Sequence, residues 1–181
     1  MHVITPIVLV LLLAFTTNGH DLANAQDIAA SDISQTLPHD PGPAGKKTLE
    51  GIDSDNDGVR DDVQRWIALT YPSSEKTRTA VIQMAKAMQL ILLNAADEAN
   101  ARTNSIAADK AADCISFVRE QILGRDSDAY NLKRELEAIY LNTSVRSRAW
   151  LQADSFLSGM FFNVPSDLST GCDFNPNAMP N

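Results

Sequence analysis

The stretch GIDSDNDGVRDDVQRWI, residues 51–67, carries five aspartates around one glycine. The first three, Asp53, Asp55 and Asp57, lie at every second position, so their carboxylates can turn toward one centre. Repulsion among charges this close needs a cation or full solvation to relieve it. A calcium ion takes about six to eight oxygen ligands and suits such a cluster. The residue types and their spacing therefore predict a calcium loop.

The string DSDNDGVRDDVQ resembles the calcium loops of EF-hands, dockerins and thrombospondin type 3 repeats. Gly58 stands at the sixth position, where the chain must turn sharply and a left-handed backbone favours glycine. The resemblance implies a set of ligands in register: Asp53, Asp55, Asp57, the backbone carbonyl of Val59, Asp61 and Gln64. The longer string also resembles secreted bacterial proteins of unassigned role that carry one such loop before a helical domain. It covers 17 of 181 residues and implies nothing about the task of the helical domain.

Three departures from the EF-hand pattern shape this prediction. Gln64 replaces the bidentate glutamate at the twelfth position, which predicts weak affinity, about 10⁻⁴ to 10⁻³ M. Arg60 replaces the apolar residue through which paired loops join, and the chain holds no second loop. Pro43, Gly45 and Gly51 precede the loop. We therefore expect no helix there, and so no two-helix clamp of the kind that opens in calcium sensors.

Two other interpretations of the loop stay open. Asp-Gly and Asn-Asp are ordinary turn pairs, so the segment could be a solvated acidic turn that caps a helix. Magnesium is the second alternative, although it prefers a strict octahedron and keeps several of its waters. The regular spacing of the aspartates favours calcium over both.

The elements that must position the loop are helical. Apolar residues recur at three-to-four spacing after the loop and predict helices over about 59–71, 74–96, 101–123, 127–141 and 144–162. Ser73 or Ser74 is expected to cap the second helix, and Asp126 or Ser127 the fourth. In the fifth helix one stripe is expected to face the core: Val145, Ala149, Ala153, Phe156 and Met160, widened by Trp150, Leu157 and Phe161.

These patterns predict an all-α fold, an irregular bundle of four to five helices over residues 59–162. The calcium loop at 51–64 precedes it. Residues 26–50 are rich in proline and glycine and are expected to form a flexible linker, a disordered N-terminal tether. Residues 163–181 read as a C-terminal tail.

The N-terminal residues, 1–25, resemble a signal peptide. Residues 3–15 form an apolar run that is too short to cross a bilayer, which needs roughly 20 such residues. Ala23-Asn24-Ala25 offers a small-x-small cleavage site, so we expect cleavage before Gln26 and a secreted or periplasmic protein. We expect no stable membrane insertion after cleavage. A short membrane anchor is the alternative.

The chain has two cysteines, Cys114 and Cys172. In an oxidising compartment a lone pair usually closes as a disulfide. This bridge would staple the C-terminal tail to the third predicted helix. Two buried free thiols are the alternative.

Charge and composition argue against several classes of function. The formal net charge of −8 argues against binding to nucleic acid, whose phosphates need basic patches. His2 and His20 lie in the predicted signal peptide and His39 in the linker, which leaves the folded domain without a histidine for catalysis. Glu135 and Glu137 lie two residues apart on one helix and should face different ways. We therefore expect no enzyme.

Two functions from different classes remain. The chain is either a secreted calcium-binding helical module or an interaction protein, an adaptor or inhibitor whose surface calcium sets. A protein partner is possible in the second case, but the sequence does not identify it. An exposed apolar patch on the folded domain would favour the interaction protein.

Overall fold

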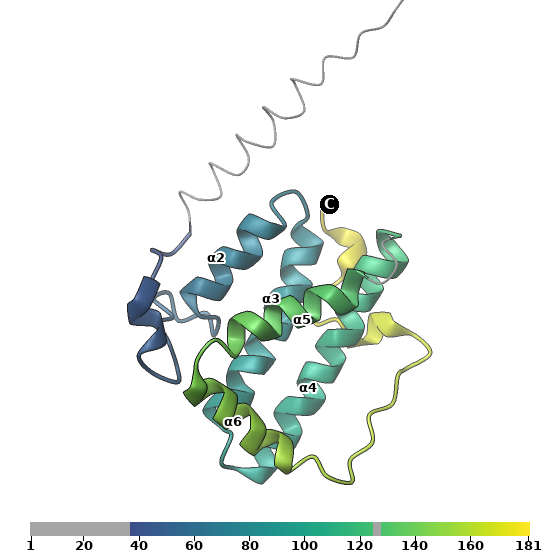
Figure 1. The fold of residues 1–181 in the computed structure, drawn as a ribbon. Coiled ribbons are helices and arrows are strands. Elements are labelled where there is room, and N and C mark those ends of the chain that lie inside the picture. The colour runs from purple at the N-terminus through teal and green to yellow at the C-terminus, as the bar shows by residue number, and fades with distance from the viewer. Residues whose placement is uncertain (1–36, 125–127) are drawn as a thin grey trace, which may run out of the picture.

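The computed structural model describes residues 37–124 and 128–181 of the chain, and that part is built of helices and loops without a strand (Figure 1). The α-helices are α2 (Asp61–Thr70), α3 (Glu75–Leu93), α4 (Glu98–Ser116), α5 (Asp128–Tyr140) and α6 (Ser144–Ser155). The short elements are η1 (Gly42–Lys46), η2 (Phe117–Ile122), η3 (Leu168–Gly171) and η4 (Pro176–Ala178). The prediction of an all-α fold is confirmed. The expected signal peptide, 1–25, and the first part of the expected linker, 26–36, lie outside the described residues.

Side-chain caps fix where the helices begin. Ser74, one of the two caps that the sequence predicted for this helix, accepts a hydrogen bond from the amide of Thr77 at the start of α3. Asp97 accepts a hydrogen bond from the amide of Asn100 at the start of α4. This helix begins at Glu98, three residues before its predicted start at residue 101. Each cap satisfies an amide that has no partner within its helix. The expected cap of α5, Asp126 or Ser127, lies outside the described residues.

Helix α3 occupies the centre of the bundle and contacts α2, α4, α5 and α6. In Figure 1, α3 and α4 run side by side and α5 crosses them. Met88 and Leu92 on α3 are fully buried, and the carbonyl of Ala85, one turn before Met88, accepts a hydrogen bond from the Tyr140 hydroxyl at 2.7 Å. This bond ties the end of α5 to the middle of α3, next to the site described below.

The third predicted helix ends differently from the expectation. The α-helix stops at Ser116 and continues as η2, a wider π-helical segment. The predicted inward residues Cys114, Ile115 and Val118 are nevertheless all fully buried. Gly124 follows with a left-handed φ of 62°, which suits the predicted stop.

Helix α6 departs from the prediction in two ways. Val145 is 47% exposed, and Arg146 is fully buried in its place. The inward stripe is therefore Arg146, Ala149, Trp150 and Ala153, and a charged residue holds its first core position. The helix also ends at Ser155, well before 162, and Phe161 is 91% exposed. Serines and Gly159, whose φ is 79°, are poor helix formers and stop the helix although the apolar spacing continues.

The described part of the expected linker, residues 37–50, is ordered against the bundle. It forms η1, and the Arg146 guanidinium donates hydrogen bonds to the carbonyls of Gly45, Thr48 and Leu49 at 2.6, 3.2 and 3.1 Å. Gln89 donates to the carbonyl of Glu50 at 2.9 Å. The expectation of little fixed structure before about Leu49 is thus corrected for these residues. Proline and glycine content did not reveal that side chains from α3 and α6 would bind this backbone.

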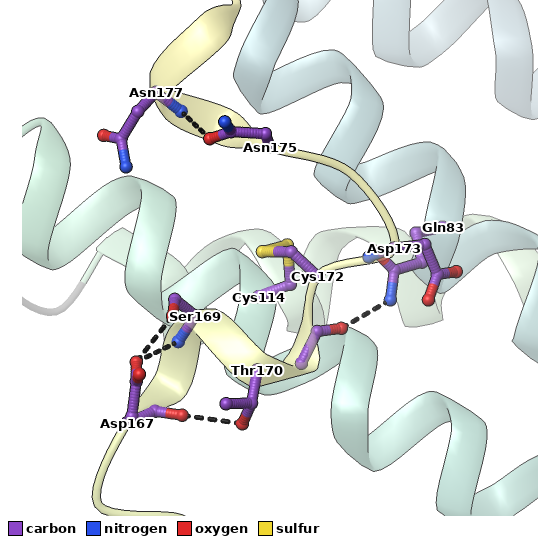
Figure 2. Close-up of a disulfide and its surroundings, with 10 residues drawn as sticks. Gln83, Cys114, Asp167, Ser169, Thr170, Cys172, Asp173, Asn175 and Asn177 are labelled. Atoms are coloured by element: carbon purple, nitrogen blue, oxygen red, sulfur yellow. Dashed lines mark hydrogen bonds between the residues drawn. A yellow bond between two sulfur atoms is a disulfide. The ribbon is translucent and has the colours of Figure 1, made fainter.

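The C-terminal tail is held against α3 and α4. Cys114 of α4 and Cys172 are joined by the predicted disulfide, with their Cα atoms 4.7 Å apart (Figure 2). Gly171 lies so close to α4 that a Cβ atom there would collide with the carbonyl of Lys110. The side chain of Gln83 clamps the tail from α3, because it donates to the Gly171 carbonyl at 2.7 Å and accepts from the Asp173 amide at 3.1 Å.

The end of the tail reaches the connection between α2 and α3 (Figure 1). Ser74 donates to the side chain of Asn181 at 2.9 Å, and the amide of Lys76 donates to the carbonyl of Pro180 at 3.3 Å.

None of the helices in the described part combines the length and the apolar character that a membrane crossing requires.

Opening the disulfide should destabilise the bundle. The bridge closes a loop with a sequence separation of 58, and loop-closure entropy gives such a loop about 4 kcal/mol of stability. We expect chemical denaturation in the presence of a reductant to show that loss in the free energy of unfolding. A Cys114→Ala/Cys172→Ala variant is the control, since the reductant should leave its unfolding curve unchanged. Equal stability of the wild type with and without reductant would contradict the stapled tail.

Candidate metal centre

The predicted loop brings three carboxylates together. Asp53, Asp55 and Asp61 each offer one oxygen, and these oxygens lie within 4.8 Å of one another. Asp61 is only 2% exposed. Within residues 37–124 and 128–181, this is the one cluster of acidic, histidine or cysteine side chains with the spacing that a metal ion requires. The cluster could therefore hold a metal ion.

Two left-handed residues fold the loop around Asp53. Asn56 has a φ of 57° and Gly58 a φ of 90°. This turn aims the amides of Asp57 and Gly58 at the Asp53 carboxylate, over 3.2 and 3.0 Å. The Asp57 amide also lies 3.3 Å from Asp55. The backbone thus holds both aspartates on the inside of the turn.

Asp61 closes the loop from the other side, as the first residue of α2. Its amide donates to the carbonyl of Ile52 at 2.8 Å, and its carboxylate accepts from the amide and hydroxyl of Ser54 at 2.8 and 3.2 Å. The carboxylate also stands at the positive end of the helix dipole. Both ends of the loop are therefore fixed to the start of one helix.

Asp57 and Gln64 lie beside the cluster. The Asp57 carboxylate accepts from the amide of Val59 at 2.8 Å, and its burial raises its pKa. The side-chain amide of Gln64 donates to Asp55 at 3.1 Å and reaches Asp57 at 3.5 Å. This donation is the main reason that the pKa of Asp55 is lowered. The N–H group of Gln64 therefore partly stabilises the negative charge of Asp55 and Asp57, as a cation would.

The other half of the Gln64 amide has no partner. Its Oε1 atom is buried and accepts no hydrogen bond. Nitrogen and oxygen of a side-chain amide occupy nearly the same volume, so a half-turn of the amide would aim Oε1 at Asp55 and Asp57. Three acceptor groups facing one another are stable only around a cation. The atoms available to bind a metal ion here are all oxygens, which suit a hard divalent ion such as calcium or magnesium.

Of the six predicted ligands, three converge directly: Asp53, Asp55 and Asp61. Asp57 and Gln64 are joined to them by hydrogen bonds. Val59 is fully buried and donates its amide to Asp57. The role of the Val59 carbonyl as a ligand stays a prediction.

Arg60 connects the loop to the bundle, a role that its place in the loop pattern does not predict. Its side chain is fully buried and pairs with Asp62 through bonds of 2.9 and 3.0 Å. It also donates to the carbonyls of Ile139 and Tyr140 at the end of α5, over 3.0 and 3.4 Å. The guanidinium carbon lies 4.7 Å from the centre of the Tyr140 ring. Arg60, which replaces the apolar residue of paired EF-hand loops, thus binds the C-terminus of α5, where the helix carbonyls favour a cation.

Gly51 stands where the loop meets both buried arginines. Its φ is 76°, and a Cβ atom there would clash with Arg60 and lie 2.9 Å from the guanidinium of Arg146. Arg146 also donates to the side chain of Asn142 at 2.6 Å. The entry to the loop, the end of α5 and the start of α6 therefore form one buried polar junction. Nothing in the apolar periodicity marks this junction, because charged and polar groups form it.

Comparison with known proteins adds no relative: no family model, no curated protein and no solved structure matches the chain.

Replacing Arg60 tests the polar junction. Arg60→Met keeps much of the volume but leaves Asp62 and two helix carbonyls without their buried donor, which should cost about 3 kcal/mol of unfolding free energy. Arg102→Met is the control, because Arg102 forms an exposed pair with Glu98 four residues earlier and should cost at most about 0.5 kcal/mol. Denaturant unfolding measures both. Losses of equal size would show that Arg60 is not a structural anchor.

Proposed function

We propose that this protein is a secreted or periplasmic calcium-binding protein in which calcium serves a structural purpose. The observation that carries the proposal is the convergence of Asp53, Asp55 and Asp61 in a loop that sequence spacing had already predicted. The resemblance of DSDNDGVRDDVQ to known calcium loops supports the choice of ion. The disulfide between Cys114 and Cys172 is compatible with an oxidising compartment outside the cytoplasm.

In this proposal the chain supplies the ligands, and calcium supplies positive charge. Asp53, Asp55 and Asp61 hold the ion, and Asp57 and Gln64 complete the oxygen set after the Gln64 amide turns over. The backbone bonds from Asp57 and Gly58 keep the Asp53 carboxylate in place before the ion arrives. Preorganisation of this kind lowers the entropic cost of binding.

Calcium stabilises one conformation of the loop here and does not trigger a conformational change. The loop leads directly into the core: Val59 in the loop and Val63 on α2 are fully buried, and Ile67 on α2 is 1% exposed. Arg60 fixes the same segment to the end of α5. A sensor exposes an apolar groove by separating two helices that flank its loop. The described residues before this loop form the short η1 instead of such a helix.

A binding test follows from thermodynamic linkage. With an affinity of about 10⁻⁴ to 10⁻³ M, calcium at about 5 mM should add about 1–2 kcal/mol of stability and raise the melting temperature by several degrees. Asp53→Asn and Asp61→Asn should each abolish this rise, because each removes one charge from the converging set. Differential scanning calorimetry in calcium and in EDTA measures the effect.

Glu135→Gln is the matched control, since it removes one charge from an exposed position on α5. It should keep the full response to calcium. A wild type that melts at the same temperature in calcium and in EDTA would refute the proposal. A Glu135→Gln variant that loses the response as completely as Asp53→Asn would show a general charge effect.

A second function, an interaction module, is favoured by apolar side chains on the surface. Phe161 is 91% exposed, Val164 is 82% exposed and Leu151 is 66% exposed. Phe161 and Val164 lie in the segment between α6 and η3. Exposed apolar side chains that gather into one patch mark a surface that binds another molecule, and Phe161 and Val164 are close in sequence.

A further inference from the structure

The described residues contain a hollow of about 230 Å³ between α3, α4 and α6. Its floor is apolar and includes Met84, Ala108 and Trp150. Leu157 and Phe162, from the segment that follows α6, form one wall. A space of this volume is smaller than a typical small-molecule pocket and fits one or two side chains of a partner.

Three carboxylates from three different helices line the same hollow. They are Asp109 of α4, Glu137 of α5 and Asp154 of α6. Burial raises the pKa of Asp109, and the positive charge of Lys133 opposes that effect. These carboxylates do not form a metal-binding cluster by the distances in the described chain. Their spread favours an extended, flexible positive group over a single metal ion.

A second hollow continues the surface along α4. It shares Asp109 and Phe162 with the first and adds Asp113 and Phe161. We call the two hollows together the acidic groove. Phe162 is 42% exposed and Phe161 91% exposed, so the acidic groove offers open aromatic rings as well as carboxylates. Lys110 also lines the second hollow, and the positive charge of Lys133 acts on Asp109 and Asp113. These two lysines offset only part of the charge of the four carboxylates, so the acidic groove keeps a net negative charge.

We propose that the acidic groove binds a basic peptide segment of a partner protein, in which a lysine or arginine is flanked by apolar residues. The long basic side chain enters the first hollow, its stem lies against Trp150 and Met84, and its charged end meets the carboxylates. The flanking apolar residues cover Phe161 and Phe162. A cation beside an indole ring and carboxylates gains from both.

Charge decides between a basic partner and a second copy of this chain. Two copies that met through the same face would bring their acidic grooves together, which like-charge repulsion opposes. The formal net charge of the chain, −8, also speeds the approach of a basic segment. This site does not depend on the calcium loop, so its test is separate from that of the proposed function.

Tryptophan fluorescence can follow binding at the groove. The chain has two tryptophans, and Trp66 packs edge-on against Tyr71 and does not line the hollow. A Trp66→Phe variant therefore reports on Trp150 alone. The probe is a synthetic amidated peptide that alternates lysine with leucine and phenylalanine, titrated into the full chain. We expect saturable binding that weakens as salt is added. A peptide with glutamate in place of lysine should not bind.

Matched variants locate the site. Glu137→Gln combined with Asp154→Asn should weaken binding about tenfold, since two charge contacts of about 0.7 kcal/mol each are lost. Phe162→Ser should weaken it as well, and circular dichroism checks that the half-exposed substitution leaves the fold intact. The control combines Glu135→Gln with Asp173→Asn, two exposed carboxylates that do not line the first hollow, and should bind as the wild type does.

Three results would overturn the proposal. The first is no saturable change in Trp150 fluorescence with the basic peptide. The second is an equal loss of affinity in the control and in the groove variant, which would mean general attraction to an acidic protein. The third is a concentration-dependent dimer in sedimentation that Phe161→Ser abolishes, which would assign the face to a second copy of the chain.

Discussion

Electrostatic repulsion within residues 53–61 is the constraint on which the rest of the structure depends. Asp53, Asp55 and Asp61 are drawn to within 4.8 Å of one another, although like charges at that distance repel. Backbone amides and the Gln64 side chain offset part of the repulsion. A divalent ion would offset the rest, and the segment it would fix begins the first helix of the bundle.

The buried arginines carry that local order into the core. Arg60 follows the turn and binds the last carbonyls of α5, while Arg146 in the first turn of α6 binds the backbone of residues 45–49. Removing either guanidinium would leave buried carbonyls without donors, which is costly. These hydrogen bonds therefore couple the stability of three segments: the residues before the loop, the loop itself and the α5–α6 connection. The disulfide acts independently at the other end, where it holds the tail to α4.

Sequence reasoning succeeded where a repeating signal exists. Apolar spacing located the helices, Ser74 was foreseen as a cap, and alternate aspartates marked the loop. It failed where a charged residue occupies a core position, since Arg146 carries no apolar signal and Val145 beside it does. It also extended the last helix past Ser155, because spacing alone cannot show whether an apolar face has anything to pack against. Phe161 fits the apolar spacing of the helix but is 91% exposed in the structure.

Calorimetric titration of the metal-stripped protein with calcium measures whether the aspartate loop binds the ion. We expect one calcium site per chain with a dissociation constant of about 10⁻⁴ to 10⁻³ M, and weaker binding of magnesium in the same experiment. The absence of any binding heat with calcium, or magnesium binding as tight as that of calcium, would contradict it.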